Sequence, residues 1–191
     1  MLEIEPRWIG AFTFVQIAAP TRGAIGEYHD YAARVSELAA AINARYAAAE
    51  HPPIVLVNEH HEPDAVYEHY RAADLCFVSS LDDGMNLVAK EFGAARDDER
   101  GVLVLSQFAG ASRELPEALV VNPYDADQCA AALARALTMP PDEQRERMRF
   151  MRGVVREFNI YRWAGRMLLD AAVLRQRARF RHRSDRLEAT A

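Results

Sequence analysis

The run Asp83-Gly84-Met85-Asn86-Leu87-Val88-Ala89-Lys90-Glu91-Phe92 joins a short apolar segment, Leu75 to Ser79, to a stretch with the pattern of a helix. A glycine-containing turn between a parallel strand and a helix exposes backbone N–H groups, and the helix dipole also favours an anion there. Asp83 opens the turn and Glu91 lies further along the helix. These carboxylates can accept hydrogen bonds from sugar hydroxyls on either side of a diphosphate. The pattern therefore predicts a phosphate site flanked by sugar contacts.

Other apolar runs of strand length recur along the chain, and most are continuous rather than alternating. This is typical of parallel strands that are covered by helices on both faces. The further predicted strands are Phe12 to Ala18, Ile54 to Val57, Val102 to Ser106 and Leu119 to Val121. The predicted helices are Tyr28 to Tyr46, Pro63 to Ala72, Leu87 to Ala95, Ala126 to Leu137, Pro141 to about Val155 and one from about Ile160. This order predicts an α/β fold with a Rossmann-like, doubly wound parallel sheet and extra carboxyl-terminal helices.

The first predicted helix carries apolar residues at steps of three and four, among them Tyr31, Val35, Leu38 and Ile42. Such a stripe is the buried face of an amphipathic helix. We therefore expect the whole stripe to pack into the core rather than to bind a cofactor.

The composition indicates a globular protein of one ordinary domain, because the 191 residues are 50% hydrophobic and 27% charged. A net charge of −5 argues against a general nucleic-acid binder, although residues 175–186 contain six arginines and one acid. We expect a domain of residues 1–175 and a basic tail of residues 176–191 that is a solvated helix end. Two cysteines form no disulfide framework or metal-ligand spacing, which favours a reducing cytoplasm. Neither a secretion signal nor a membrane span is predicted.

Polar segments follow four of the predicted strands, at the edge where a doubly wound sheet binds its ligands. They are Pro20 to Arg22, Asn58 to His61, Ser80 to Gly84 and Ser106 to Gly110. Four polar loops at one edge of one sheet indicate a binding site rather than scattered surface.

The individual residues leave alternatives open. Glu91 equally fits a solvated helix acid, and Arg22 is either a phosphate clamp or a surface charge. The adjacent His60 and His61 usually point to different sides, and a shared metal would need further ligands. The Asp82-Asp83 pair can suggest a divalent cation, but the following glycine and helix fit direct anion binding better.

Four strings of this sequence closely resemble the trehalose-6-phosphate synthase family, which is glycosyltransferase family 20. They are FVQIAAPTR at residues 14–22, DGMNLVAKE at 83–91, VLSQFAGA at 104–111 and LVVNPYD at 119–125. The resemblance covers essentially the whole chain and implies the carboxyl-terminal, donor-binding half of a two-domain GT-B fold. It also implies transfer of glucose from UDP-glucose to glucose 6-phosphate with retention, without a metal or another cofactor. For such retaining enzymes the resemblance implies a front-face mechanism, in which the leaving phosphate oxygen deprotonates the acceptor. The protein would then mainly position the reactants and stabilise developing charge.

The resemblance implies a role for each matching residue. Asp83 is expected to bind hydroxyls of the donor glucose, and Glu91 those of the ribose. The amides of Gly84, Met85, Asn86 and Leu87 would hold the sugar and diphosphate. Val88, His60 and His61 would border the uracil, and Arg22 would face the acceptor phosphate.

The resemblance covers only the second of the family's two domains. Because Met1 lies a few residues before the strand at Phe14, the chain also lacks the motif whose arginine and lysine grip the diphosphate. Each such charge-assisted contact is worth about 1.5–3 kcal/mol. We therefore expect no synthase activity from this polypeptide alone. The segment Phe158 to Trp163 resembles the one that crosses back to the first domain, so we expect part of its apolar face to be exposed.

Three hypotheses follow. The chain is a fragment, or half of a split synthase that needs a partner chain carrying the acceptor domain. Alternatively, it is a non-catalytic UDP-sugar-binding or regulatory subunit that associates with a full-length synthase. The third hypothesis is the donor half of a glucosylglycerol-phosphate synthase, which keeps the donor and changes the acceptor.

Overall fold

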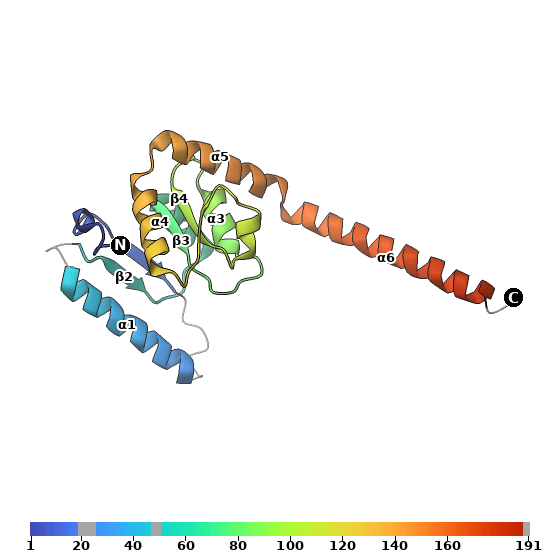
Figure 1. Cartoon of the computed structure of the whole chain (residues 1–191), viewed down its shortest axis with the longest axis horizontal. Helices are drawn as coiled ribbons and strands as arrows, with labels where there is room; N and C mark the ends of the chain where they lie inside the picture. Colours follow the sequence, from blue (N-terminus) through green and yellow to red (C-terminus); the bar gives the residue numbers. More distant parts are fainter. Residues whose placement is uncertain (19–25, 47–50, 189–191) are drawn as a thin grey trace.

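The computed structural model describes residues 1–18, 26–46 and 51–188, and gives only the helical backbone for residues 26–29 and 179–188. The strands within these residues are β1 (Phe14–Ile17), β2 (Ile54–Val57), β3 (Leu75–Val78), β4 (Val102–Ser106) and β5 (Leu119–Val121). The helices are α1 (Gly26–Tyr46), α2 (Pro63–Ala72), α3 (Leu87–Ala95), α4 (Ala126–Thr138), α5 (Pro141–Glu157) and α6 (Ile160–Glu188), with 3-10 turns η1 (Pro6–Trp8) and η2 (Gly110–Arg113) (Figure 1). The predicted elements are confirmed with small changes at their ends, whereas the two 3-10 turns were not predicted.

All the paired strands are parallel, which confirms the α/β fold class. Phe14 lies opposite Ile54 in the first ladder, and β3, β4 and β5 form a second ladder in that order. The prediction of one continuous sheet needs a correction, because the described strands form two separate hydrogen-bonded ladders. Phe14 of β1 and Phe77 of β3 line the same apolar cavity. Side chains of both ladders thus border this cavity, and no backbone pairing joins the described strands of one ladder to those of the other.

The core is built around β4, all five residues of which are buried. Leu103 and Leu105 face one side, where they join a cluster with Phe92 of α3 and Met148 of α5. Val102 and Val104 face the other side and belong to a second cluster, which α4 covers. The continuous apolar run thus reflects burial on both faces, as the sequence predicted.

Among the described residues, helix α1 packs mainly against β2 of the narrow β1–β2 ladder (Figure 1). The side-chain amide of Asn43 accepts from the Ile54 N–H at 2.9 Å and donates to the Ile54 carbonyl at 2.8 Å, so it fixes the helix to β2. The expectation that the whole stripe is buried was wrong. Ala39 is buried, but Tyr31 is 68% exposed and Leu38 is 63% exposed. Two strands are too narrow to cover a helix of 21 residues.

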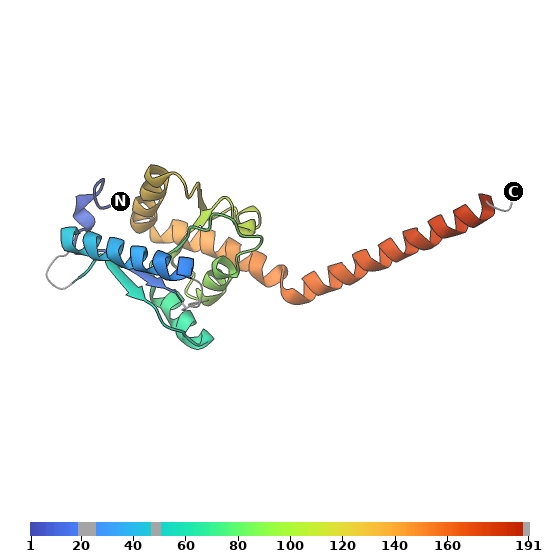
Figure 2. The ribbon, with the colours of Figure 1, turned by 90° about the horizontal axis from the view of Figure 1, so that it is seen from below.

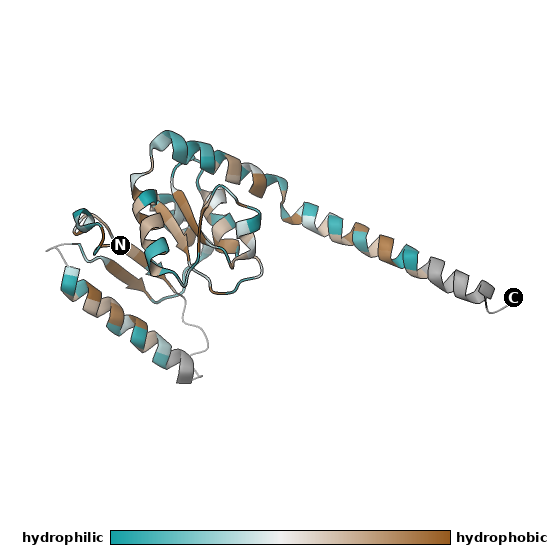
Figure 3. Cartoon of the chain, viewed as in Figure 1, coloured by the Kyte–Doolittle hydropathy of each residue, from teal (hydrophilic) through white to brown (hydrophobic). Residues whose placement is uncertain are grey.

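Helix α5 packs against α3, and the chain then turns at Phe158 and Asn159 into α6. The side-chain oxygen of Asn159 accepts from the N–H groups of Tyr161 and Arg162, both at 3.1 Å, and so caps the new helix. Figures 1 and 2 show α6 projecting away from the rest of the molecule. As expected, apolar side chains at the start of α6 are exposed, among them Ile160 and Trp163. Figure 3 shows hydrophobic residues along the projecting helix.

The backbone of α6 continues through residue 175, so the division into a domain and a basic tail stays a prediction. No helix in the described ranges has the length and apolarity that a bilayer crossing requires.

Arg96 joins the ends of α2 and α3 from a buried position, with only 5% of its surface exposed. One guanidinium nitrogen donates to the carbonyls of Tyr70, Arg71 and Ala73 at 2.9, 2.8 and 2.6 Å. Two other nitrogens bind the carboxylate of Asp98 at 3.0 and 2.9 Å. The guanidinium therefore satisfies the carbonyls that end α2 and holds this helix against α3.

We predict that Arg96→Ala lowers the free energy of unfolding by about 3 kcal/mol, because it leaves partly buried carbonyls and Asp98 without their donor. Urea denaturation followed by circular dichroism measures this change. The control is Arg149→Ala, which breaks an exposed pair with Glu99 and should cost under about 0.5 kcal/mol. Equal effects of the two substitutions would contradict the structural role of Arg96.

Candidate functional site

The carboxylate of Asp83 organises the turn between β3 and α3. Its Oδ1 atom accepts from the N–H groups of Met85 at 3.1 Å and Asn86 at 2.9 Å. Its Oδ2 atom accepts from the side-chain amide of Asn86 at 2.9 Å. The backbone amides of Met85 and Asn86, which were expected to hold the sugar and diphosphate, therefore donate to Asp83 in this structure.

Asn86 begins α3 as its N-cap. Its side-chain oxygen accepts from the Ala89 N–H at 2.9 Å, and its amide nitrogen also donates to the Ser80 hydroxyl at 3.3 Å. The residue is buried and adopts φ = 65°, a conformation that asparagine tolerates better than most residues. The first helical residues, Leu87 and Val88, are exposed. The N–H groups of a first turn find no partner within the helix; here Asn86 caps that of Ala89, and those of Leu87 and Val88 lie at this exposed end.

The turn is held against the segment that follows β4. The Asp83 N–H donates to the Phe108 carbonyl at 3.2 Å, and the Gly110 N–H donates to the Asp83 carbonyl at 2.8 Å. The Ala111 N–H donates to the Met85 carbonyl at 2.8 Å. A Cβ atom added at Gly110 would overlap the carbonyl of Gly84, so only glycine permits this approach. The structure thus brings together two of the four loops that the sequence placed at one edge.

The hydrogen bonds to Asp83 lower its pKa from the ordinary 3.8. The Met85 N–H contributes most, followed by the side-chain amide of Asn86. Asp83 is therefore ionised near neutral pH and offers a carboxylate beside the exposed end of α3. Asp82 is exposed, and its side chain makes none of the hydrogen bonds that hold this turn.

Glu91 is half-buried on the second turn of α3, and its Oε2 atom accepts from the hydroxyl of Tyr70 at 3.4 Å. Asp83 and Glu91 thus lie before and after the first turn of one helix, as the sequence suggested. Tyr70, which comes from α2, was not among the residues that the sequence predicted for the site. Nothing in the local pattern distinguishes Tyr70 from other tyrosines on amphipathic helices, because its partner lies 21 residues away.

The two histidines after β2 have different surroundings, as adjacent residues usually do. His60 is exposed, with Nε2 at 3.7 Å from the Glu62 carboxylate. The side chain of His61 is 15% exposed, and its ring meets His69 edge-on at 5.6 Å. The Nε2 atom of His61 is buried without a hydrogen-bond partner among the described residues. The contacts of both histidines are thus with the segment between β2 and α2 and with α2 itself. Arg22 lies outside the described residues.

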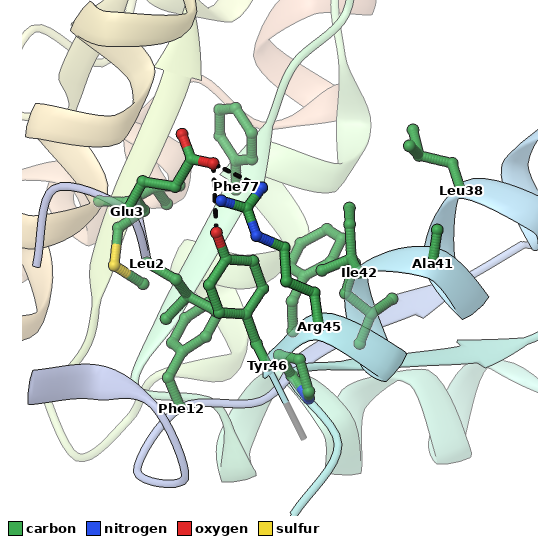
Figure 4. A pocket seen from close by; sticks show the side chains of 14 residues that line it. Leu2, Glu3, Phe12, Leu38, Ala41, Ile42, Arg45, Tyr46 and Phe77 are labelled. Atoms are coloured by element: carbon green, nitrogen blue, oxygen red, sulfur yellow. Dashed lines mark hydrogen bonds and ion pairs between the residues drawn. The ribbon is translucent and has the colours of Figure 1, made fainter. Parts of the chain in front are cut away.

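A cavity of about 540 Å³ lies away from this site, lined mainly by the amino-terminal segment, α1 and the starts of β1 and β2 (Figure 4). Its lining includes Phe14 and Ile54, the first residues of their strands, whereas the candidate site lies where strands end. At its mouth Glu3 pairs with Arg45 at 2.8 Å and accepts from the Tyr46 hydroxyl at 3.2 Å. Across the described part of the chain, no three His, Cys, Asp or Glu side chains are grouped so that they could hold a metal ion.

Comparison with known proteins shows similarity over most of the chain. The sequence profile of Glycosyltransferase family 20 matches residues 1–172. A trehalose-6-phosphate synthase from Klebsiella pneumoniae is 43% identical over 171 residues, which are 89% of this chain and 36% of that protein.

Two solved structures are similar with a TM-score of 0.86 and 42% identity. One, from E. coli, is described as bound with UDP-2-fluoro glucose; 88% of this chain matches 38% of that chain. The other is an alpha,alpha-trehalose-phosphate synthase (UDP-forming) from Burkholderia xenovorans in complex with glucose-6-phosphate, with coverage of 88% and 37%. This chain thus spans little more than a third of the length of each relative.

We predict that Gly110→Ala lowers the free energy of unfolding by about 2 kcal/mol, because the added methyl group pushes the two loops apart. The matched control is Gly153→Ala in α5, where the added carbon meets no atom within 4 Å. That substitution should be neutral or stabilise the helix by up to about 1 kcal/mol. Urea denaturation compares the two, and a neutral Gly110→Ala variant would show that the loops do not need this approach.

We also predict a pH dependence of the turn. Because the pKa of Asp83 is lower in the folded state, its hydrogen bonds stabilise the protein fully above pH 3.8. This contribution disappears as the pH falls through the lowered value. Carboxyl-carbon NMR should give a midpoint below 3.8 that rises in Asn86→Ala, measured where circular dichroism remains native. A midpoint at or above 3.8 in the wild type would contradict the observed hydrogen bonding.

Proposed function

Because the chain belongs to glycosyltransferase family 20, we propose that it binds a uridine diphosphate sugar at the turn between β3 and α3. The observation that carries this proposal is the exposed amino end of α3 with the carboxylates of Asp83 and Glu91 before and after its first turn. The amides and the dipole of a helix amino end suit a diphosphate, and carboxylates suit sugar hydroxyls. The chain would thus supply the donor half of a glucosyl transfer.

The proposed contacts follow the geometry of the turn. A carboxylate has about four lone-pair sites. Three bonds from the turn therefore leave Asp83 able to accept one from the donor glucose. The amides at Leu87 and Val88 would hold the diphosphate, together with the backbone at Gly84. Met85 and Asn86 would act mainly by holding Asp83, with their N–H groups shared between it and the ligand.

The remaining roles rest on the family. Glu91 would bind the ribose hydroxyls, and Val88, His60 and His61 would border the uracil. Arg22 would face the acceptor phosphate. The E. coli relative bound with UDP-2-fluoro glucose and the Burkholderia xenovorans relative in complex with glucose-6-phosphate support UDP-glucose as donor and glucose 6-phosphate as acceptor.

We propose the complete transfer only in combination with a polypeptide that supplies the part of the relatives that this chain does not span. In that assembly the protein would position the two sugars and stabilise the charge that develops on the leaving diphosphate, with no metal required. The exposed apolar side chains of α6 are consistent with such a partner.

We predict saturable binding of UDP-glucose to the isolated chain, measured by titration calorimetry. The double variant Asp83→Ala/Glu91→Ala should weaken binding by at least about tenfold, because it removes two charged acceptors. The control variant Asp142→Ala/Glu146→Ala removes two exposed acids of α5 and should bind like the wild type. If the first variant binds as tightly as the control, the ligand lies elsewhere.

We further predict that the chain alone releases no UDP from UDP-glucose and glucose 6-phosphate, as a coupled assay would show. Steady UDP release that the Asp83→Ala/Glu91→Ala variant abolishes would demonstrate a complete enzyme and contradict this prediction. UDP-glucose binding without turnover would agree with either a donor half or a regulatory module. Recovery of activity on adding an amino-terminal half from a relative would then favour the donor half.

A further inference from the structure

Tyr70 is held rigidly beside Glu91. Its ring meets Phe92 edge-on at 6.1 Å between ring centres and Tyr67 at 6.2 Å. Phe92 is fully buried in the core beneath α3, so the Tyr70 ring rests against a fixed surface. Because edge-to-face contacts favour one ring orientation, this packing directs the hydroxyl to one place.

The backbone of Tyr70 is also fixed relative to α3. Arg96 immediately follows α3. Its guanidinium donates a hydrogen bond to the Tyr70 carbonyl at 2.9 Å and also to the carbonyls of Arg71 and Ala73. The same guanidinium lies 5.9 Å from the centre of the Phe92 ring. The two helix ends therefore keep their relative position, and the fold itself sets the spacing of Tyr70 and Glu91.

The Tyr70 hydroxyl acts as a donor to the carboxylate. Burial raises the pKa of Tyr70 well above its ordinary 10, and the charge of Glu91 raises it further, so the hydroxyl keeps its proton at neutral pH. The oxygens are 3.4 Å apart, longer than is usual for two hydrogen-bonded oxygen atoms. The hydrogen bond occupies one lone pair of Oε2 and leaves Oε1 and the second lone pair of Oε2 for a ligand.

On the basis of the proposed function, we infer that Tyr70 is a positioning residue for the nucleotide. It holds the Glu91 carboxylate so that its remaining lone pairs meet both hydroxyls of a ribose. An unrestrained glutamate would lose rotamer freedom on binding, whereas one already held by Tyr70 loses less. The ligand class is therefore a nucleoside diphosphate with an intact ribose cis-diol, and Tyr70 contributes to the preference for it.

The test compares two ligands, UDP and 2′,3′-dideoxy-UDP, by titration calorimetry. Tyr70→Phe should weaken UDP binding by about fivefold, because it removes one hydrogen bond to a charged group. It should change binding of the dideoxy nucleotide by less than about twofold, since that ligand has no hydroxyls for Glu91. In a Glu91→Gln background, Tyr70→Phe should cause no further loss for either ligand, because the oriented carboxylate is already absent.

Tyr67→Phe is the matched control, because it removes a hydroxyl from the same helix and keeps the ring that contacts Tyr70. It should bind both ligands like the wild type. Thermal unfolding of each variant verifies that the fold is kept.

The possible outcomes separate the two proposals. Wild-type chain that binds neither nucleotide overturns the proposed function and this inference with it. Wild-type chain that prefers UDP, with Tyr70→Phe keeping the full preference, overturns the role of Tyr70 alone. If Tyr70→Phe weakens the binding of UDP and of the dideoxy nucleotide equally, the role of Tyr70 is merely structural, and the inference is overturned. A loss confined to UDP and absent in the Glu91→Gln background supports it.

Discussion

The candidate site depends on the carboxylate of Asp83, which accepts hydrogen bonds from the N–H groups of the turn before α3. A carboxylate in this place satisfies donors that the turn would otherwise leave free. The backbone approach at Gly110 then fixes the turn to the loop after β4, the most deeply buried strand. Backbone hydrogen bonds therefore hold the turn at Asp83 in a fixed position relative to the core. A site built in this way needs little rearrangement to present its helix end to an anion.

The sequence predicted those features that depend on local pattern. Continuous apolar runs such as Val102 to Ser106 mark buried parallel strands, and the turn at Asp83 and Gly84 marks a strand-to-helix connection. Asp83 and Glu91 could be singled out because both belong to one local strand-turn-helix segment, Asp83 at the start of the turn and Glu91 on the helix. The meeting of the loops after β3 and β4 also followed, because parallel strands end at one edge of a sheet.

Features that depend on contacts between distant segments could not be predicted in this way. The hydrogen bond from Tyr70 to Glu91 and the capture of the α2 carbonyls by Arg96 arise only once α2 and α3 lie side by side. The apolar stripe of α1 correctly indicated a helix but not its burial, because burial depends on the width of the surface beneath it. Tyr31 and Leu38 extend beyond the two strands available. The turn preference of Asp83 was visible, whereas its hydrogen bonds to the N–H groups of Met85 and Asn86 were not.

Helix α6 and the core around β4 differ in local stability. Its 29 residues span about 43 Å, and most of its described side chains are exposed. A helix with so little tertiary packing is stabilised mainly by its own propensity and by pairs of neighbouring side chains, as in an isolated peptide. Its amide protons should therefore exchange with deuterium through local opening, long before those of β4, which exchange only when the whole core opens. Any partner that covers α6 would bring the two exchange rates together, so the helix itself reports on assembly.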